Sequence, residues 1–111
     1  MEKKFKLTES ETVELKSSLS ERHEILDTIS AFSNTKGGAI YVGIDPQGRV
    51  IGIDEGYRTF EDLANEIKQN TDPKVFPTIE GIKIENKNVL LIKVAEYPTK
   101  PVWATDGSTA C

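Results

Sequence analysis

Cysteine and histidine are almost absent from the sequence, which contains one of each, Cys111 and His23. A single cysteine cannot form an internal disulfide, and together the two residues do not supply the four ligands of a structural zinc site. No serine or cysteine stands at a spacing from His23 that predicts a catalytic triad, so we expect this histidine to be a surface residue. These absences exclude a disulfide scaffold and a zinc domain.

Long apolar stretches and an excess of positive charge are also missing. No apolar run approaches the roughly 20 residues of a membrane span. No apolar segment follows the basic residues at the start, so we expect no signal peptide, no membrane contact and a cytoplasmic location. The length of 111 residues suits a single domain over 1–111. Fourteen basic against 18 acidic residues argue against coating of nucleic acid by bulk attraction, but leave a local basic surface open.

Hydrophobic periodicity predicts a strand followed by two helices that are separated along the chain. Residues 12–16 alternate between apolar and polar, as in a half-buried strand. Apolar residues recur at helical spacing over 25–32 and again over 60–69. Ser18 and Glu21 fit a capping box at the start of the first helix.

Two β-hairpins are predicted between and after the helices. The first joins strands 39–44 and 49–53 through the turn Asp45–Gly48, which has Pro and Gly at the positions that a type I turn favours. The second joins 78–84 to 89–94. The expected fold is therefore α+β, in the order β-α-β-β-α-β-β, with two helices and a mixed or antiparallel sheet.

One segment partly matches the sequence motif of a nucleotide-binding phosphate loop. The segment 43–50 nearly matches the phosphate loop, with Arg49 in place of the lysine and Val50 in place of the hydroxyl that holds magnesium. It also predicts a tight turn between strands, without the helix N-terminus that binds phosphate. ATP is therefore not an expected cofactor.

Three carboxylates deserve a chemical interpretation. Glu9 and Glu14 precede and lie within the first strand, and Asp45 ends the strand 39–44, so a pairing of these strands would bring the three together. Three oxygen ligands without soft donors suit Mg²⁺ or Mn²⁺, which could activate water against a phosphodiester. The alternative is structural, because Asp45 also suits the first position of its turn and Glu14 suits a solvated strand.

Three ordered motifs resemble the Schlafen AlbA_2 domain family. They are ESETVELK at 9–16, AFSNTKGG at 31–38 and AIYVGID at 39–45, with a later TKPV at 99–102. The resemblance covers about residues 8–102 and implies an α+β domain. In bacteria and archaea it implies the N-terminal part of larger proteins described as transcriptional regulators or as RecG-helicase-related, and we expect this chain to be such a truncated piece.

The resemblance implies two activities and leaves a third class open. The first is a nucleic-acid-binding module, acting on DNA in a regulator-like protein. The second is the metal-dependent endoribonuclease activity of animal Schlafen proteins, whose three active-site carboxylates correspond to Glu9, Glu14 and Asp45. The third is a protein-interaction domain. A homodimer could replace the paired domains of the animal enzyme. The candidate phosphate contacts are four cations, Lys16, Lys36, Arg49 and Lys100.

The choice between DNA and RNA stays open at this stage. Aromatic residues such as Tyr41, Tyr97 and Trp103 are scattered along the chain, and the sequence predicts no stacking stripe of the kind that single-strand binders use. Trp103 is instead expected to cover the sheet.

Overall fold

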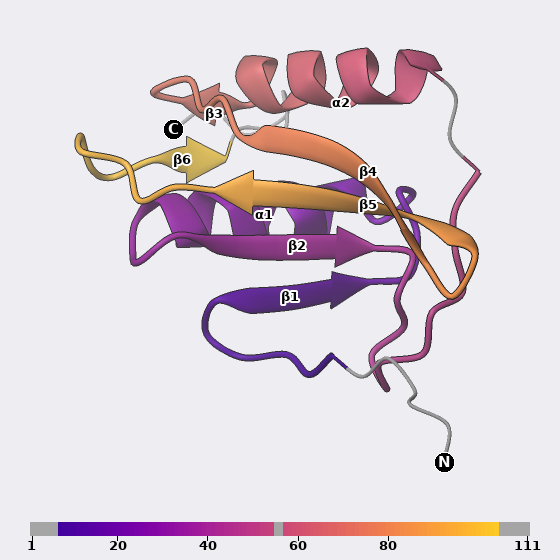
Figure 1. The fold of residues 1–111 in the computed structure, drawn as a ribbon. Helices are drawn as coiled ribbons and strands as arrows, with labels where there is room; N and C mark the ends of the chain where they lie inside the picture. Colours follow the sequence, from indigo (N-terminus) through magenta and orange to yellow (C-terminus); the bar gives the residue numbers. More distant parts are fainter. Residues whose placement is uncertain (1–6, 55–56, 105–111) are drawn as a thin grey trace.

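The computed structural model describes residues 7–54 and 57–104, and confirms an α+β fold with two helices (Figure 1). Cys111 lies outside the described residues. Within them, no helix is both long and apolar enough to cross a membrane. The elements are β1 (Val13–Lys16), α1 (Arg22–Ser33), β2 (Gly38–Val42), α2 (Tyr57–Gln69), β3 (Thr71–Asp72), β4 (Thr78–Ile84), β5 (Lys87–Val94) and β6 (Trp103–Ala104).

A mixed four-stranded sheet organises the fold, with strand order β1-β2-β5-β4. β1 and β2 are parallel, because α1 carries the chain back to the end at which β1 began. β2 with β5 and β5 with β4 are antiparallel, and the last pair is the hairpin predicted for 78–94. β3 and β6 form a separate two-stranded sheet beside the end of α2 (Figure 1).

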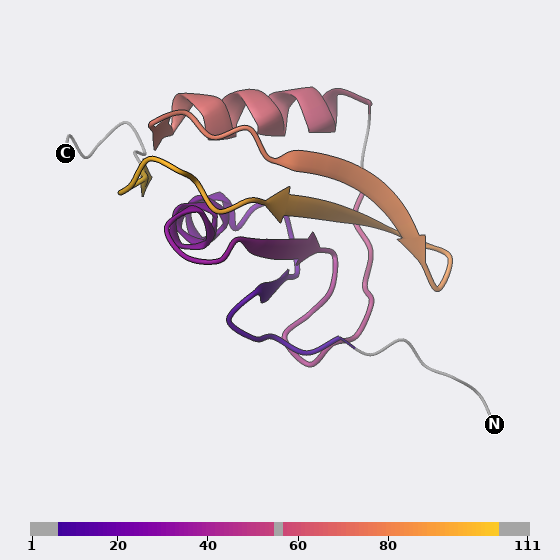
Figure 2. The same cartoon turned by 60° about the vertical axis from the view of Figure 1, so that its left-hand side comes forward.

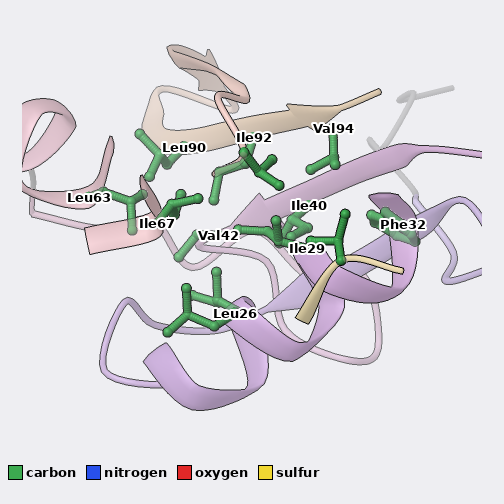
Figure 3. Packing of buried hydrophobic residues seen from close by; sticks show 13 residues of the cluster. Leu26, Ile29, Phe32, Ile40, Val42, Leu63, Ile67, Leu90, Ile92 and Val94 are labelled. Carbon is green, nitrogen blue, oxygen red and sulfur yellow. The ribbon is translucent and has the colours of Figure 1, made fainter. Parts of the chain in front are cut away.

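Both helices pack on one face of the large sheet. Alternate residues of β2 and β5, such as Ile40 and Ile92, lie opposite each other in register and point toward the helices. Ile29 and Phe32 of α1 and Leu63 of α2 meet them there, and all are nearly inaccessible to solvent (Figure 3). Figure 2 shows α1 nearly end-on beside the sheet. Burial of this apolar face is the main driving force for the arrangement.

The opposite face carries a smaller apolar cluster, formed by Leu15, Ile44, Val50 and Val89. The strand predicted for 49–53 is wrong. The turn Asp45–Gly48 is present, with Gly48 N–H donating to the Asp45 carbonyl, but only Ile44 and Val50 form a bridge beyond it.

The predicted strand 49–53 is missing because the backbone hydrogen bonds of Ile51 and Gly52 do not follow a strand ladder. Ile51 and Gly52 both donate to the single carbonyl of Gly43, and the positive φ of Gly52 then redirects the chain. Ile53 N–H donates to Asn88, so the segment crosses to the β4–β5 hairpin rather than extending the first one. The short strands β3 and β6 were not predicted.

The predicted capping box is also wrong. Ser18 Oγ accepts the N–H of Ser20 at 3.0 Å, so the hydroxyl is used in a local turn before the helix begins. α1 starts at Arg22, and Glu21 occupies the N-cap position without a side-chain hydrogen bond to the helix.

Candidate functional site

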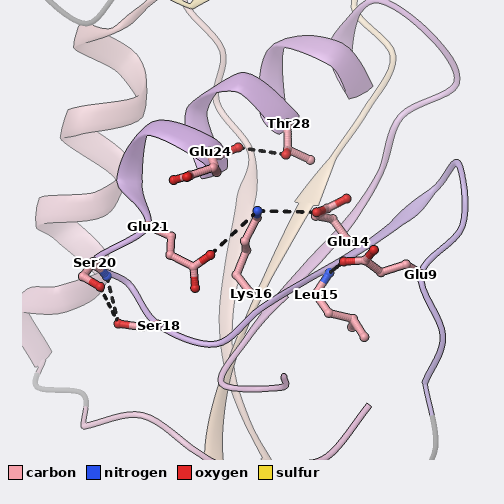
Figure 4. Close-up of polar contacts among 9 residues, drawn as sticks. All are labelled: Glu9, Glu14, Leu15, Lys16, Ser18, Ser20, Glu21, Glu24 and Thr28. Atoms are coloured by element: carbon pink, nitrogen blue, oxygen red, sulfur yellow. Dashed lines mark hydrogen bonds and ion pairs between the residues drawn. The ribbon is translucent and has the colours of Figure 1, made fainter. Parts of the chain in front are cut away.

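Glu9 lies at the open edge of the sheet, where it accepts a hydrogen bond from the β1 backbone. Its Oε2 is 3.2 Å from the backbone nitrogen of Leu15, on the side of β1 away from β2 (Figure 4). Ser10 pairs with Val13 on the same edge. The first motif therefore occupies the Val13 backbone and the Leu15 N–H on the outer side of this edge strand, groups that otherwise would be free to pair with another chain.

Glu14 and Lys16 lie on the face of β1 that is covered by α1. Their partners in register are Ile40 and Val42, which point toward the helices. Lys16 Nζ lies 3.5 Å from Glu14 Oε2 and 3.9 Å from Glu21 Oε1, and its side chain is 13% exposed (Figure 4). Lys16 is therefore enclosed by two carboxylates and offers little surface to a phosphate.

Asp45 is held by its own turn. Its Oδ1 accepts the backbone N–H groups of Gln47 at 3.0 Å and Arg49 at 2.9 Å, and its Oδ2 accepts Nε of Arg49 at 2.9 Å. The Arg49 backbone N–H, followed by the guanidinium of the same residue, lowers the pKa of Asp45 against the opposing effect of desolvation. Asp45 is thus an ionised turn residue at neutral pH.

The three carboxylates are not assembled as a metal site in the described part of the chain. No group of three or more histidine, cysteine, aspartate or glutamate side chains there could hold a metal ion. Glu9 binds the edge of β1, Glu14 pairs with Lys16 under α1, and Asp45 closes its turn. The residues as placed do not fit Mg²⁺ or Mn²⁺, and no catalytic step is derived through a metal.

Glu9→Ala should lower the free energy of unfolding by about 1 kcal/mol, because the N–H of the buried Leu15 loses its acceptor. Glu9→Gln should cost much less, since an amide oxygen can still accept. Chemical denaturation of the two variants and wild type checks this. Equal losses for alanine and glutamine would contradict a structural role for the acceptor.

Asp45→Asn should lower the urea midpoint of unfolding at pH 7, and the difference from wild type should shrink as pH falls below about 4. The folded-state pKa of Asp45 is depressed, so its stabilisation is complete above the unfolded pKa and is lost as pH falls through the folded pKa. Urea titrations from pH 2 to 7 measure this. Asp54→Asn, which changes an exposed carboxylate, is the control, and an Asp45→Asn difference that matches it at every pH would contradict the role of the Asp45 contacts.

The remaining predicted cations lie at opposite ends of the sheet. Arg49 follows β2, and its side chain is 76% exposed. Lys36 precedes β2 and is 74% exposed, while Lys100 follows β5 and is 38% exposed. Both lysines are ion-paired, Lys36 with Glu11 at 2.8 Å and Lys100 with Glu96 at 2.6 Å. The four cations therefore do not form one patch.

Asn34, which the sequence reasoning did not single out, joins two of the motifs. Its amide nitrogen donates to the Val102 carbonyl at 3.0 Å, and its Oδ1 accepts the Val102 N–H at 2.7 Å. Ser30 Oγ donates to the same carbonyl at 2.6 Å. The sequence does contain an asparagine just after a predicted helix and a later K-P-V segment. No local pattern links the two, because Asn34 and Val102 are 68 residues apart.

The fold and these motif contacts define a small α+β domain of a known family. The chain matches the Schlafen, AlbA_2 family over residues 9–110, and it belongs to that family. The match begins close to the expected residue 8 and extends beyond 102. No curated protein matches the sequence.

Two solved structures are similar in fold. The first, the DIP2311 protein from Corynebacterium diphtheriae, has a TM-score of 0.72 and 22% identity, covering 94% of this chain and 21% of that one. This chain thus spans about a fifth of that protein. The second is the N-terminal domain of a protein from Nitrosomonas europaea described as related to the ATP-dependent DNA helicase RecG. It has a TM-score of 0.69 and 20% identity, covering 95% of this chain and 84% of that one.

Proposed function

We propose that this domain binds nucleic acid, with Arg49 contacting phosphate at one end of the sheet and Lys36 and Lys100 contacting other phosphates at the opposite end. The observation that carries the proposal is the exposed guanidinium of Arg49, held in place by Asp45. Family membership and the RecG-related neighbour support a role connected with nucleic acid. Within a longer protein the domain would serve as the DNA-binding part of a transcriptional regulator.

Arg49 is suited to a phosphate because it is oriented before any ligand arrives. Asp45 accepts the Nε proton, so the two terminal nitrogens remain the outward donors of a planar group. Two parallel N–H donors match two phosphate oxygens, and a side chain already held in place loses less conformational entropy on binding. The same Asp45 also accepts the Arg49 backbone N–H, which ties the contact to the turn.

Arg49→Gln should weaken binding of a DNA duplex by roughly three- to tenfold at low salt, and should reduce the slope of log affinity against log salt by about 1. The reason is the loss of one phosphate contact with its counterion release. Fluorescence anisotropy at several salt concentrations measures both quantities. Lys83→Gln, which removes an equal charge from an exposed position of β4, is the matched control.

The outcome that contradicts this proposal is equal affinity and equal salt slope for wild type, Arg49→Gln and Lys83→Gln. The same samples test the nuclease alternative, with folded transfer RNA in Mn²⁺ or EDTA. Cleavage that requires Mn²⁺ and disappears in Asp45→Asn would replace the binding proposal with a catalytic one, and would require Glu9 and Asp45 to leave the contacts described above.

A further inference from the structure

Two aromatic side chains are displayed to solvent at the β3–β6 end of the fold. Phe76 is 71% exposed and Trp103 is 52% exposed, so the expectation that Trp103 covers the sheet is wrong. The third exposed large apolar residue among those described, Ile51, is 48% exposed and follows the turn after β2. Phe76 and Trp103 differ from Ile51 in being aromatic and in adjoining the β3–β6 pair, since Trp103 lies in β6 and Phe76 follows β3 by four residues.

The local backbone places both aromatics on one corner. Trp103 pairs in register with Asp72, and both are exposed, while their neighbours Thr71 and Ala104 turn inward. Thr71 Oγ1 accepts the N–H of Val75 at 3.0 Å, so the chain turns back on itself just before Phe76. Figure 1 shows β3 and β6 side by side at this corner.

Buried residues and hydrogen bonds hold the backbone of this corner in place. Val102 and Val75, the residues that precede the two aromatics, are 1% and 3% exposed. Asn34 binds the Val102 backbone at both its N–H and its carbonyl. Tyr97 donates its hydroxyl proton to the Lys74 carbonyl at 2.6 Å. The exposure of the aromatic rings is therefore imposed by buried neighbours on either side of the small sheet.

Cations flank the aromatics. Lys74 precedes Phe76 by two residues, is exposed, and makes no ion pair within the described chain. Lys100 precedes Trp103 by three residues and is paired with Glu96. Asp72 is the acidic group opposite Trp103. Aromatic faces with lysines close by suit a ligand with both planar rings and phosphates, which favours a nucleic acid over an apolar protein surface.

We propose that Phe76 and Trp103 stack on unpaired bases of single-stranded nucleic acid, with Lys74 and Lys100 facing its phosphates. The inference rests on the proposed function and adds a ligand class to it. Every base has a π-face, so stacking gives affinity for single strands with little sequence preference. The sequence predicted no stacking stripe, because residues 76 and 103 are brought to one corner only by the β3–β6 pairing.

Trp103 is the only tryptophan of the chain, which makes it a direct reporter. The experiment adds oligothymidylate of about 16 nucleotides to the full chain at low salt, and follows Trp103 fluorescence and the anisotropy of a labelled strand. A duplex of equal length is run in parallel. We expect the single strand to quench Trp103 and to bind more tightly than the duplex.

The variants separate stacking from charge. Phe76→Ala and Trp103→Ala should each weaken single-strand binding by about fivefold or more, while Trp103→Phe should retain most of the affinity. Ile51→Ala, which shortens an exposed apolar side chain after the turn, is the matched control and should bind like wild type. All three positions are exposed, and circular dichroism verifies the fold of the four variants.

Two results would overturn the inference and leave the proposed function standing. One is duplex and single-strand binding of equal strength that neither aromatic variant changes, without quenching of Trp103. The other is a wild-type dimer in sedimentation that Phe76→Ala or Trp103→Ala converts to monomer with unchanged affinity for the oligonucleotide, since the corner would then be a protein interface. Absence of binding to both nucleic acids would instead defeat the proposed function itself.

Discussion

Gly37→Ala should lower the free energy of unfolding by about 2 to 4 kcal/mol. Gly37 has a φ of +81°, a conformation that costs alanine more than glycine. An added Cβ would also lie 2.6 Å from the Val94 carbonyl oxygen and 3.0 Å from the Glu96 nitrogen. Both neighbours are backbone atoms, so relief requires movement of the loop between α1 and β2 or of the end of β5.

Urea denaturation of Gly37→Ala measures the loss, and Gly81→Ala is the control because Gly81 is an exposed residue of β4 without a positive φ. The control should change stability by only a few tenths of a kcal/mol to about 1 kcal/mol, in either direction. A Gly37→Ala variant as stable as wild type would contradict the close approach between the loop and β5. The adjacent Lys36 should also lose its defined position, so its contribution to nucleic-acid binding should fall.

Asn34→Ala should lower the free energy of unfolding by about 2 to 3 kcal/mol. The change removes both hydrogen bonds to the Val102 backbone, at 2.7 and 3.0 Å. Val102 is 1% exposed, so its N–H would stay buried without this acceptor, which is the costly case for a hydrogen-bonding group. The Val102 carbonyl would keep only the hydroxyl of Ser30.

Because Trp103 follows Val102 directly, its fluorescence should report loosening of this corner before global unfolding. Asn34→Asp separates the two bonds: its carboxylate can still accept the Val102 N–H, but its second oxygen would face the Val102 carbonyl as a second acceptor, so this variant should also lose stability. If both variants were as stable as wild type, the joint between α1 and the C-terminal segment would be dispensable. Asn34→Ala should also weaken single-strand binding, through the displaced Trp103.

Local sequence patterns predicted a helix or strand correctly where one face of that element is buried in the core along its whole length. The alternation around Leu15, the helical stripe ending at Phe32 and the apolar run through Ile40 each predicted the element that forms. The hairpin of β4 and β5 followed from its turn and its two flanking runs. Side-chain periodicity is a property of consecutive residues, so it is readable without knowledge of the fold.

The predictions from sequence were wrong where a hydrogen-bonding group had more than one available partner. The segment after Asp45 bonds to Gly43 and then to Asn88, rather than continuing the hairpin. The Ser18 hydroxyl bonds to Ser20 rather than capping α1. Each competing contact differs by a small free energy, and tertiary packing decides between them.

The sequence by itself determined the family, the α+β class and the acidic identity of residues 9, 14 and 45, because these depend on residue types in order along the chain. Only the tertiary structure decided what those residues contact. It places Glu9 at the edge of β1, Glu14 in an ion pair with Lys16, and Asp45 in its own turn. It also joins Asn34 to Val102, and pairs Trp103 with Asp72 of β3. Distances between residues far apart in sequence are set by how the helices and strands pack, and no local pattern encodes them.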